Sequence, residues 1–271
     1  MFTKAIVRSP GPNFSDGLTA AGLGVPDYHQ ALEQHAAYCA ALESCGLELI
    51  RLAADERYPD SCFVEDAALI MGRQSKAADE GVRVPSTASA IITRPGALSR
   101  RGEADSIRVE LSRLFPSIDE IQSPGTLDGG DVCEAGTHFF IGISERTNED
   151  GARQLGQLLS RYGFTHSLVD TGGTSGLLHL KSGVAHLEEK ALIVTESLST
   201  RAEFSGYDLI QVEPGDEYAA NCIAVNGRVL IAAGHPRLEV KLRALGYETI
   251  ALEMSEFQKM DGGLSCLSLR W

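Results

Sequence analysis

The sequence has no apolar run of the length that a membrane-spanning helix requires, which is roughly 18 residues. The first eight residues, Met1 to Arg8, also lack the apolar stretch and cleavage site of a secretory signal. Basic residues are scarce as well: 24 Lys and Arg stand against 37 Asp and Glu, a net charge of -13. We therefore expect a cytoplasmic protein whose main partner is neither a membrane nor nucleic acid, because both of these carry negative charge.

Motifs for metals and cofactors are missing too. The six cysteines are scattered, without a CxxC pair or a cysteine–histidine cluster of the zinc-finger kind. No Walker-type phosphate loop is present, and Gly22-Leu23-Gly24 is too short for a dinucleotide fingerprint. The sequence thus predicts neither a metal nor a cofactor. With 43% hydrophobic residues, its 271 residues can still build a substantial core.

What the sequence does contain is a unit that recurs about every 40–50 residues. Each unit has an amphipathic stretch, a Gly or Pro at its end, and then an alternating apolar run, which indicates a helix followed by a strand. The glycines fit helix C-caps, which need a left-handed backbone. The five units end their helical stretches at Gly46, Pro116, Gly163, Gly206 and Gly246.

Additional strands lie inside these units, at residues 139–142, 191–194, 222–225 and 229–232. Asn226-Gly227 separates the last two, which is a strong hairpin signal. A doubly wound sheet is the alternative, but it would alternate single strands with helices and contain no hairpins. We therefore predict an α/β fold of five ββαβ units around an axis, a propeller-like single domain over residues 1–271.

A polar cluster begins the next strand in every unit, after a turn rich in Gly, Asp or Ser. In units that radiate from one axis, these clusters would meet at the centre and bring carboxylates, an imidazole, an amide and a thiol to one pocket. Such a set fits attack by a thiolate, proton transfer by His, and carboxylates that hold a planar guanidinium cation. The clusters are residues 60–66, 126–131, 178–181, 218–222 and 261–266.

Five motifs in these clusters resemble the dimethylarginine dimethylaminohydrolase family, a branch of the guanidine-modifying superfamily with the five-bladed pentein fold. They are Phe63 to Asp66, Leu127 to Val132, Leu178 to Lys181, Ala219 to Cys222, and Asp261 to Cys266. The resemblance extends from about Ala5 to Trp271, and the order of the motifs makes it specific. It implies a pentein catalytic domain that uses neither a cofactor nor a metal.

The resemblance also implies a role for individual residues. Cys266 matches the nucleophile and His179 the acid and base, while Asp128, where some bacterial members carry Glu, would contact His179. The substrate-binding positions are Glu65 and Asp66, which with Asp128 would hold the guanidinium; Arg100 and Arg146, for the α-carboxylate; Leu18 in a lid; Asp60 and Asp261, as further acids; and Met260, through its backbone carbonyl. Asp131, by contrast, is interpreted from the residues alone as a cap of the preceding Gly-Gly turn.

The sequence therefore predicts hydrolysis of Nω-methylated L-arginine to L-citrulline and dimethylamine or methylamine, through a covalent cysteine adduct. A small guanidino compound would be the partner, and a monomer and a homodimer both stay open. One alternative is arginine deiminase or another guanidine-modifying enzyme, although those relatives are usually longer. The other is a non-catalytic pentein, which need not keep Cys266, His179 and the paired acids together.

Overall fold

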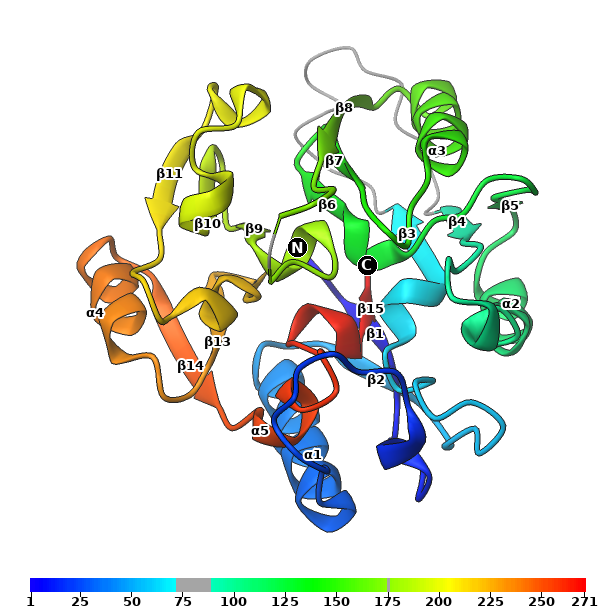
Figure 1. The fold of residues 1–271 in the computed structure, drawn as a ribbon, viewed down its shortest axis with the longest axis horizontal. Coiled ribbons are helices and arrows are strands. Elements are labelled where there is room, and N and C mark those ends of the chain that lie inside the picture. Colours follow the sequence, from blue (N-terminus) through cyan, green and yellow to red (C-terminus); the bar gives the residue numbers. More distant parts are fainter. Residues whose placement is uncertain (72–88, 175) are drawn as a thin grey trace.

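Five three-stranded sheets surround a common centre in the computed structural model, which describes residues 1–71, 89–174 and 176–271 (Figure 1). In each sheet the middle strand pairs antiparallel with one neighbour and parallel with the other. The sheets are β15 (Leu269–Arg270), β1 (Lys4–Arg8) and β2 (Glu48–Leu52); β3 (Ala68–Met71), β4 (Ser89–Ile92) and β5 (Ile118–Glu120); β6 (Val132–Ala135), β7 (His138–Ile143) and β8 (Thr165–Asp170); β9 (Val184–His186), β10 (Ala191–Val194) and β11 (Asp208–Gln211); and β12 (Ile223–Val225), β13 (Arg228–Ala232) and β14 (Glu248–Leu252).

The parallel pair of each sheet is joined by a crossover, which in four sheets contains an α-helix. These helices are α1 (Tyr28–Ser44), α2 (Glu103–Leu114), α3 (Glu149–Arg161) and α4 (Pro236–Ala244), and a further short helix, α5 (Ser255–Gln258), follows β14. This arrangement confirms the predicted α/β propeller of five ββαβ units. The crossover between β10 and β11 departs from the pattern because it contains two 3-10 helices, η6 (Glu196–Leu198) and η7 (Ala202–Phe204), in place of an α-helix.

The glycines predicted to end helices differ in the same way between the crossovers with an α-helix and the crossover without one. Gly46, Gly163 and Gly246 have φ angles of 90°, 85° and 91°, the left-handed backbone predicted for them. Gly206 is not among the residues with positive φ. The prediction for Gly206 was wrong because a short 3-10 turn precedes it, and no α-helix ends there.

Each α-helix packs its apolar stripe against its own sheet. In α3, Leu155 and Leu159 are fully buried in one cluster with Phe139 and Ile141 of β7. Full burial of one such side chain is worth about 1.5–3 kcal/mol, so this contact fixes the helix on the sheet. Asn148 begins the helix by accepting a hydrogen bond from Gly151 N at 2.8 Å.

The two ends of the chain meet in the sheet that closes the ring. Ala5 of β1 pairs with Arg270 of β15, and Ile6 pairs with Leu269. The predicted hairpin between β12 and β13 turns at Asn226, with a φ of 51°, and Gly227, with a φ of 86°. Asn226 also donates to the carbonyl oxygens of Phe2 and Cys45, which ties the last sheet to the first.

In every sheet, a one-turn 3-10 helix precedes the strand that pairs antiparallel with the middle strand, namely β15, β3, β6, β9 or β12. These turns are η2 (Val64–Ala67), η4 (Gly129–Asp131), η5 (Leu180–Ser182), η8 (Glu217–Ala220) and η9 (Ser265–Leu267). Successive turns contact one another, and Ser265 N donates to Asn221 Oδ1 at 2.9 Å, which completes the circle. The polar clusters predicted to meet at the axis therefore do meet there.

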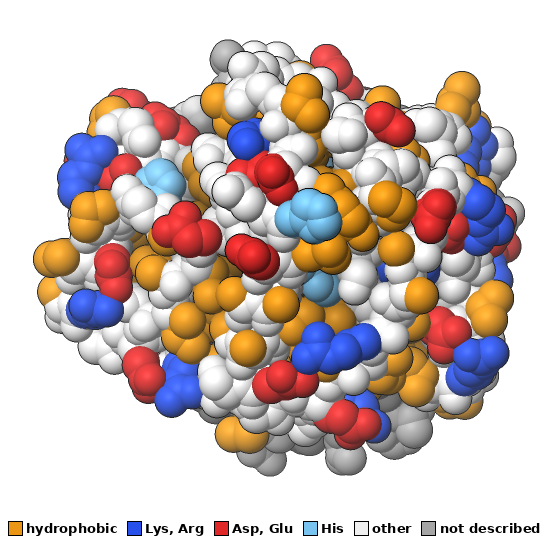
Figure 2. All heavy atoms as spheres, turned by 90° about the horizontal axis from the view of Figure 1, so that it is seen from below, with side chains coloured by type: hydrophobic (Ala, Val, Ile, Leu, Met, Phe, Trp, Pro, Cys, Tyr) orange, Lys and Arg blue, Asp and Glu red, His pale blue; other side chains and the backbone are white. Residues whose placement is uncertain are grey.

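Within the described part of the chain, no helix combines the length and the apolar character needed to cross a bilayer. Figure 2 shows one face of the molecule, on which acidic and basic side chains are interspersed with apolar ones. Charge of a single sign does not dominate that face.

Candidate active site

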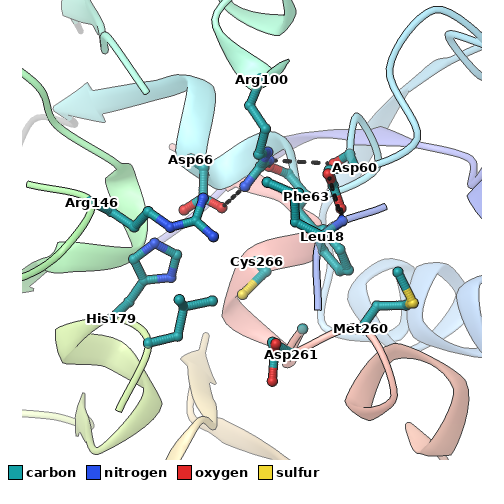
Figure 3. A pocket seen from close by; sticks show the side chains of 12 residues that line it. Leu18, Asp60, Phe63, Asp66, Arg100, Arg146, His179, Met260, Asp261 and Cys266 are labelled. Carbon is teal, nitrogen blue, oxygen red and sulfur yellow. Dashed lines mark hydrogen bonds and ion pairs between the residues drawn. The ribbon is translucent and has the colours of Figure 1, made fainter. Parts of the chain in front are cut away.

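A cavity opens at the centre of the ring of 3-10 turns (Figure 3). It is lined by Leu18, Asp60, Phe63, Asp66, Arg100, Arg146, Leu178, His179, Met260, Asp261, Gly262 and Cys266. Nine of the eleven site residues predicted from the sequence are in this lining. The other two, Glu65 and Asp128, are not in the lining: Asp128 contacts His179 of the lining, and Glu65 contacts Ser265, the residue before Cys266.

Cys266 lies in η9 at the base of the cavity, where only 7% of the residue is exposed. The preceding Gly262 and Gly263 allow a close approach of the backbone, because a Cβ at Gly262 would lie 2.2 Å from Phe63 Cε1. The thiol is therefore packed within the wall of the cavity and is almost fully buried. Burial, with the charges of Glu65 and Asp66 adding to it, raises the pKa of Cys266 to about 12.

His179 lies directly before η5 and faces Asp128, whose Oδ2 is 3.0 Å from His179 Nε2. The shorter Asp arm therefore reaches the imidazole. The other oxygen of Asp128 accepts from Gly96 N at 2.8 Å, which fixes the carboxylate. Burial disfavours the charged imidazolium, but the carboxylates of Asp66, Asp128 and Asp131 outweigh it and raise the pKa of His179 to about 9.

Asp66 is held from two sides at the head of the cavity. Its Oδ2 pairs with Arg100 Nη1 at 2.6 Å, and its Oδ1 accepts from Gly130 N at 2.9 Å. Burial alone would raise the pKa of Asp66, but His179 and Arg100 lower it to about 2. The carboxylate is therefore ionised and oriented before any ligand arrives.

The two arginines predicted for the substrate carboxylate differ in their surroundings. Arg100 is 5% exposed, and its guanidinium is engaged by Asp66 and by Glu103, whose Oε2 is 2.8 Å from Nη2. Arg146 is half-buried and lines the cavity, and the described ranges contain no ion-pair partner for it. The donors that remain for a ligand carboxylate are therefore those of Arg146, and Arg100 instead holds Asp66.

Glu65 is buried and does not belong to the cavity lining. Its Oε2 accepts from Ser265 Oγ at 2.8 Å, and its Oε1 is 2.5 Å from Lys181 Nζ. Arg270 Nη2 lies 3.9 Å from the same Oε1. Ser265, Lys181 and Arg270 thus engage the oxygens of Glu65. The contact of Glu65 with the substrate guanidinium stays a prediction.

The segment after η1 (Phe14–Asp16) contributes Leu18 to the cavity lining and is held by two of its acids. Leu18 N donates to both oxygens of Asp60, at 3.1 and 3.2 Å, and Ala20 N donates to Asp261 Oδ2 at 2.5 Å. Two of the predicted substrate-binding acids therefore hold the predicted lid residue Leu18 and its neighbour. Met260 also lines the cavity. The contact of its backbone carbonyl with the substrate stays a prediction.

Several residues around the site were not predicted. Leu178 and Phe63 add apolar surface to the lining; Leu178 adjoins His179, and Phe63 lies two residues before Glu65. Lys181 and Ser265 engage Glu65 through contacts that no local pattern announces, and Glu103 pairs with Arg100. For Glu103 alone a signal existed, because a Glu three residues after Arg100 at the start of a helix can pair with it.

Asp66, Asp128 and His179 place their ligand atoms within 4.8 Å of one another, a grouping that could hold a metal ion. Their atoms are already engaged, however, by Arg100 and Gly130 on Asp66 and by Gly96 on Asp128. The prediction of no metal stays a prediction.

Comparison with known proteins places this geometry in a family, although no family model matches the chain. The dimethylarginine dimethylaminohydrolase of Pseudomonas aeruginosa is 43% identical over the full length of both chains, and that of Streptomyces coelicolor is 34% identical over 98% of this chain and 96% of its own. A crystal structure of the Pseudomonas enzyme, a Cys-to-Ser mutant complexed with citrulline, superposes with a TM-score of 0.91 over all of both chains. The N-terminal domain of the arginine dihydrolase ArgZ shares the fold, with a TM-score of 0.81 at 18% identity over 100% of this chain and 97% of that domain. The chain therefore belongs to the dimethylarginine dimethylaminohydrolase family.

Proposed function

We propose that this chain hydrolyses Nω-methylated L-arginine to L-citrulline and dimethylamine or methylamine. The observation that carries the proposal is the meeting of Cys266, His179 and the ionised Asp66 in one cavity that Arg146 also lines. A thiol, a proton carrier and an anion for a cationic group are what the displacement of an amine from a guanidinium requires.

Binding would anchor the substrate at both ends. Asp66 offers a fixed carboxylate to the planar guanidinium, and Arg146 offers its free donors to the α-carboxylate. Asp60 and Asp261 are further acids of the lining, and Leu18 with Met260 would cover the substrate from the mouth. Holding both ends fixes the angle at which the guanidino carbon faces Cys266 Sγ.

The nucleophile is activated by the substrate itself in this proposal. With the pKa of Cys266 at about 12, its thiol is protonated in the free enzyme. A guanidinium placed between Cys266 and Asp66 brings a positive charge next to the sulfur, and an adjacent cation favours the thiolate. The thiol proton leaves to solvent as the cation binds, because His179 is already protonated, and Sγ then forms a bond to the guanidino carbon.

His179 is suited to move the protons. Because its pKa is raised to about 9, it is protonated at neutral pH and can donate to the departing nitrogen as the bond between that nitrogen and the carbon breaks. The neutral imidazole then takes a proton from water as the water oxygen attacks the adduct carbon. The C–S bond breaks, the hydroxyl proton of the adduct is lost as the citrulline carbonyl forms, and the sulfur regains a proton as citrulline leaves. Asp128 keeps the ring of His179 in place through both steps.

Residues 1–271 would act as one catalytic domain in the cytoplasm. A single domain is supported by β15, because the last strand completes the sheet of the first and the nucleophile lies directly before it. A reducing compartment suits the chain, since all six of its cysteines are free.

Product analysis tests the function. Purified protein is incubated side by side with asymmetric dimethylarginine, arginine and agmatine, and citrulline, dimethylamine and ammonia are quantified. We expect citrulline and dimethylamine in equal amounts from the methylated substrate at the highest kcat/KM. Faster release of ammonia from arginine would identify an arginine deiminase instead, and no product from any of the three would refute a guanidine hydrolase.

A further inference from the structure

Asp131 is a buried carboxylate that the proposed mechanism does not use. It ends η4, close to Asp128, and its exposed fraction is 0%. Burial raises the pKa of Asp131, opposed by the charge of His179 and by hydrogen bonds to the carboxylate. A buried carboxylate is costly unless donors satisfy it, so the groups that it binds indicate what it does in the fold.

The two oxygens of Asp131 accept hydrogen bonds from two different segments of the site. Oδ1 accepts from Leu180 N at 2.9 Å, and Leu180 directly follows His179. Oδ2 accepts from Ser144 Oγ at 2.7 Å and from Thr147 Oγ1 at 2.6 Å, the residues that flank the Arg146 turn. The carboxylate of Asp131 thus bridges the segment that carries His179 and the segment that carries Arg146.

The partners of Asp131 pass the constraint on to the site. Ser144 Oγ accepts from Arg146 N at 3.0 Å, and Thr147 Oγ1 accepts from Asp128 N at 3.1 Å. Each hydroxyl therefore donates to Asp131 and at the same time accepts from the backbone of a site residue.

The neighbouring strand leaves room for this bridge. Gly142 of β7 packs so closely that a Cβ there would lie 2.8 Å from Asp131 Oδ1 and 2.9 Å from Leu180 Cβ. The turn cap expected from the sequence does not describe these contacts. The backbone of Asp131 closes that turn, by donating to Asp128 O at 3.0 Å, and its side chain is directed to the other two segments.

We propose that Asp131 is a positioning residue that holds His179 and Arg146 in a fixed relation through a single buried carboxylate. The inference rests on the proposed function, which assigns proton transfer to His179 and substrate anchoring to Arg146. Loss of the bridge misaligns the two groups independently, so both catalysis and binding respond.

Asp131→Asn tests the bridge with little change of shape. The amide oxygen can still accept from Leu180 N, but the NH2 group that replaces the second oxygen cannot accept from the two hydroxyls. We expect kcat/KM for asymmetric dimethylarginine to fall roughly 10²-fold, the scale of loss that a misplaced site produces. Substrate affinity, measured by calorimetry in a Cys266→Ser background, falls as well.

Two further variants separate the parts of the effect. Ser144→Ala removes one hydroxyl on the Arg146 side only, so it weakens affinity about 2- to 10-fold, as for one lost hydrogen bond, while kcat stays near the wild-type value. Asp216→Asn is the matched control: Asp216 is 6% exposed and accepts from His235 and Arg237, apart from the cavity lining. It leaves both kcat and affinity unchanged.

Unchanged kcat and affinity in a folded Asp131→Asn would overturn the proposal, as would equal losses in Asp216→Asn. If Asp131→Asn does not fold, Ser144→Ala decides, and unchanged affinity in that variant counts against the bridge. If wild-type protein forms no citrulline, the proposed function fails, and the affinity measurements still decide whether Asp131 positions the ligand site.

Discussion

Three side chains around the cavity have pKa values that burial and neighbouring charge move far from their usual positions. The pKa is about 2 for Asp66, about 9 for His179 and about 12 for Cys266. At neutral pH the free site therefore holds a carboxylate, an imidazolium and a thiol. A bound guanidinium would lower the pKa of Cys266, because its positive charge favours the thiolate that attacks the substrate.

Arg146 offers a test at the scale of one residue. Arg146→Ala should lower kcat/KM for asymmetric dimethylarginine about 10- to 100-fold, as expected when a carboxylate loses a charge-assisted partner. Agmatine has no carboxylate, so its slower turnover should barely change. Arg153→Ala, which removes an exposed arginine of α3 that pairs with Glu149, is the control. Equal losses on both compounds would show that Arg146 supports the fold and does not bind substrate.

The sequence predicted which residues face the cavity but not how they are held. Asp66, His179 and Cys266 line it because each belongs to a local motif that precedes a strand. Leu18, Arg100 and Arg146 lie elsewhere in the units, and only the family resemblance pointed to them. Ser265 on Glu65 and Glu103 on Arg100 were missed, and the first of these contacts spans 200 residues of chain. Only the closed ring brings Ser265 to Glu65, so no pattern within one unit announces that contact, whereas the spacing of Arg100 and Glu103 could have revealed theirs.

At the scale of elements, the one-turn 3-10 helices position the side chains of the site, such as Asp66 in η2 and Cys266 in η9. The 3.6-residue period revealed the longer helices, but a turn of three residues is too short to show a period. The polar clusters could therefore be located in the sequence, but their 3-10 structure could not be predicted. The missing α-helix between β10 and β11 was likewise not expected, because Gly206 with the apolar run after it imitates a helix end.

The loop between β4 and α2 gives a test of close packing between elements. A Cβ at Gly96 would lie 2.3 Å from Arg146 O, a backbone atom that cannot turn away. Gly96 N also donates to Asp128. Gly96→Ala should therefore displace both segments and lower kcat/KM by up to about 10²-fold. Gly206→Ala, where a Cβ meets nothing within 4 Å, should leave kcat/KM unchanged. Similar activity of the two variants would argue that the contact does not position the site.

At the scale of the whole molecule, the ring closes through contacts between the first sheet and the C-terminal segments. His35 of α1 belongs to this region; it is 5% exposed, and its ring lies 6.5 Å from that of Phe257 in α5. Burial, together with the charge of Arg51, lowers the pKa of His35 to about 4. The folded chain therefore keeps this imidazole neutral under conditions in which the unfolded chain protonates it.

This difference predicts a pH dependence of stability. Between pH 6.5 and about 4 the unfolded state binds a proton at His35 that the folded state does not, so the free energy of unfolding falls as the pH falls through this window. The contribution is about 3 kcal/mol at most. Urea unfolding of wild type and His35→Asn at pH 7 and pH 4.5 measures it, and the variant should lose less stability on acidification. An equal loss in both proteins would contradict the assignment.

The mass of the Cys266 peptide during turnover tests the central claim most directly. Enzyme is mixed with asymmetric dimethylarginine, quenched with acid within the first turnover, digested and analysed by mass spectrometry. We predict that this peptide carries the substrate minus dimethylamine, bonded from Sγ to the guanidino carbon, and that Cys266→Ser yields neither adduct nor citrulline. An adduct on another cysteine, or citrulline formation by Cys266→Ser at the wild-type rate, would contradict the account.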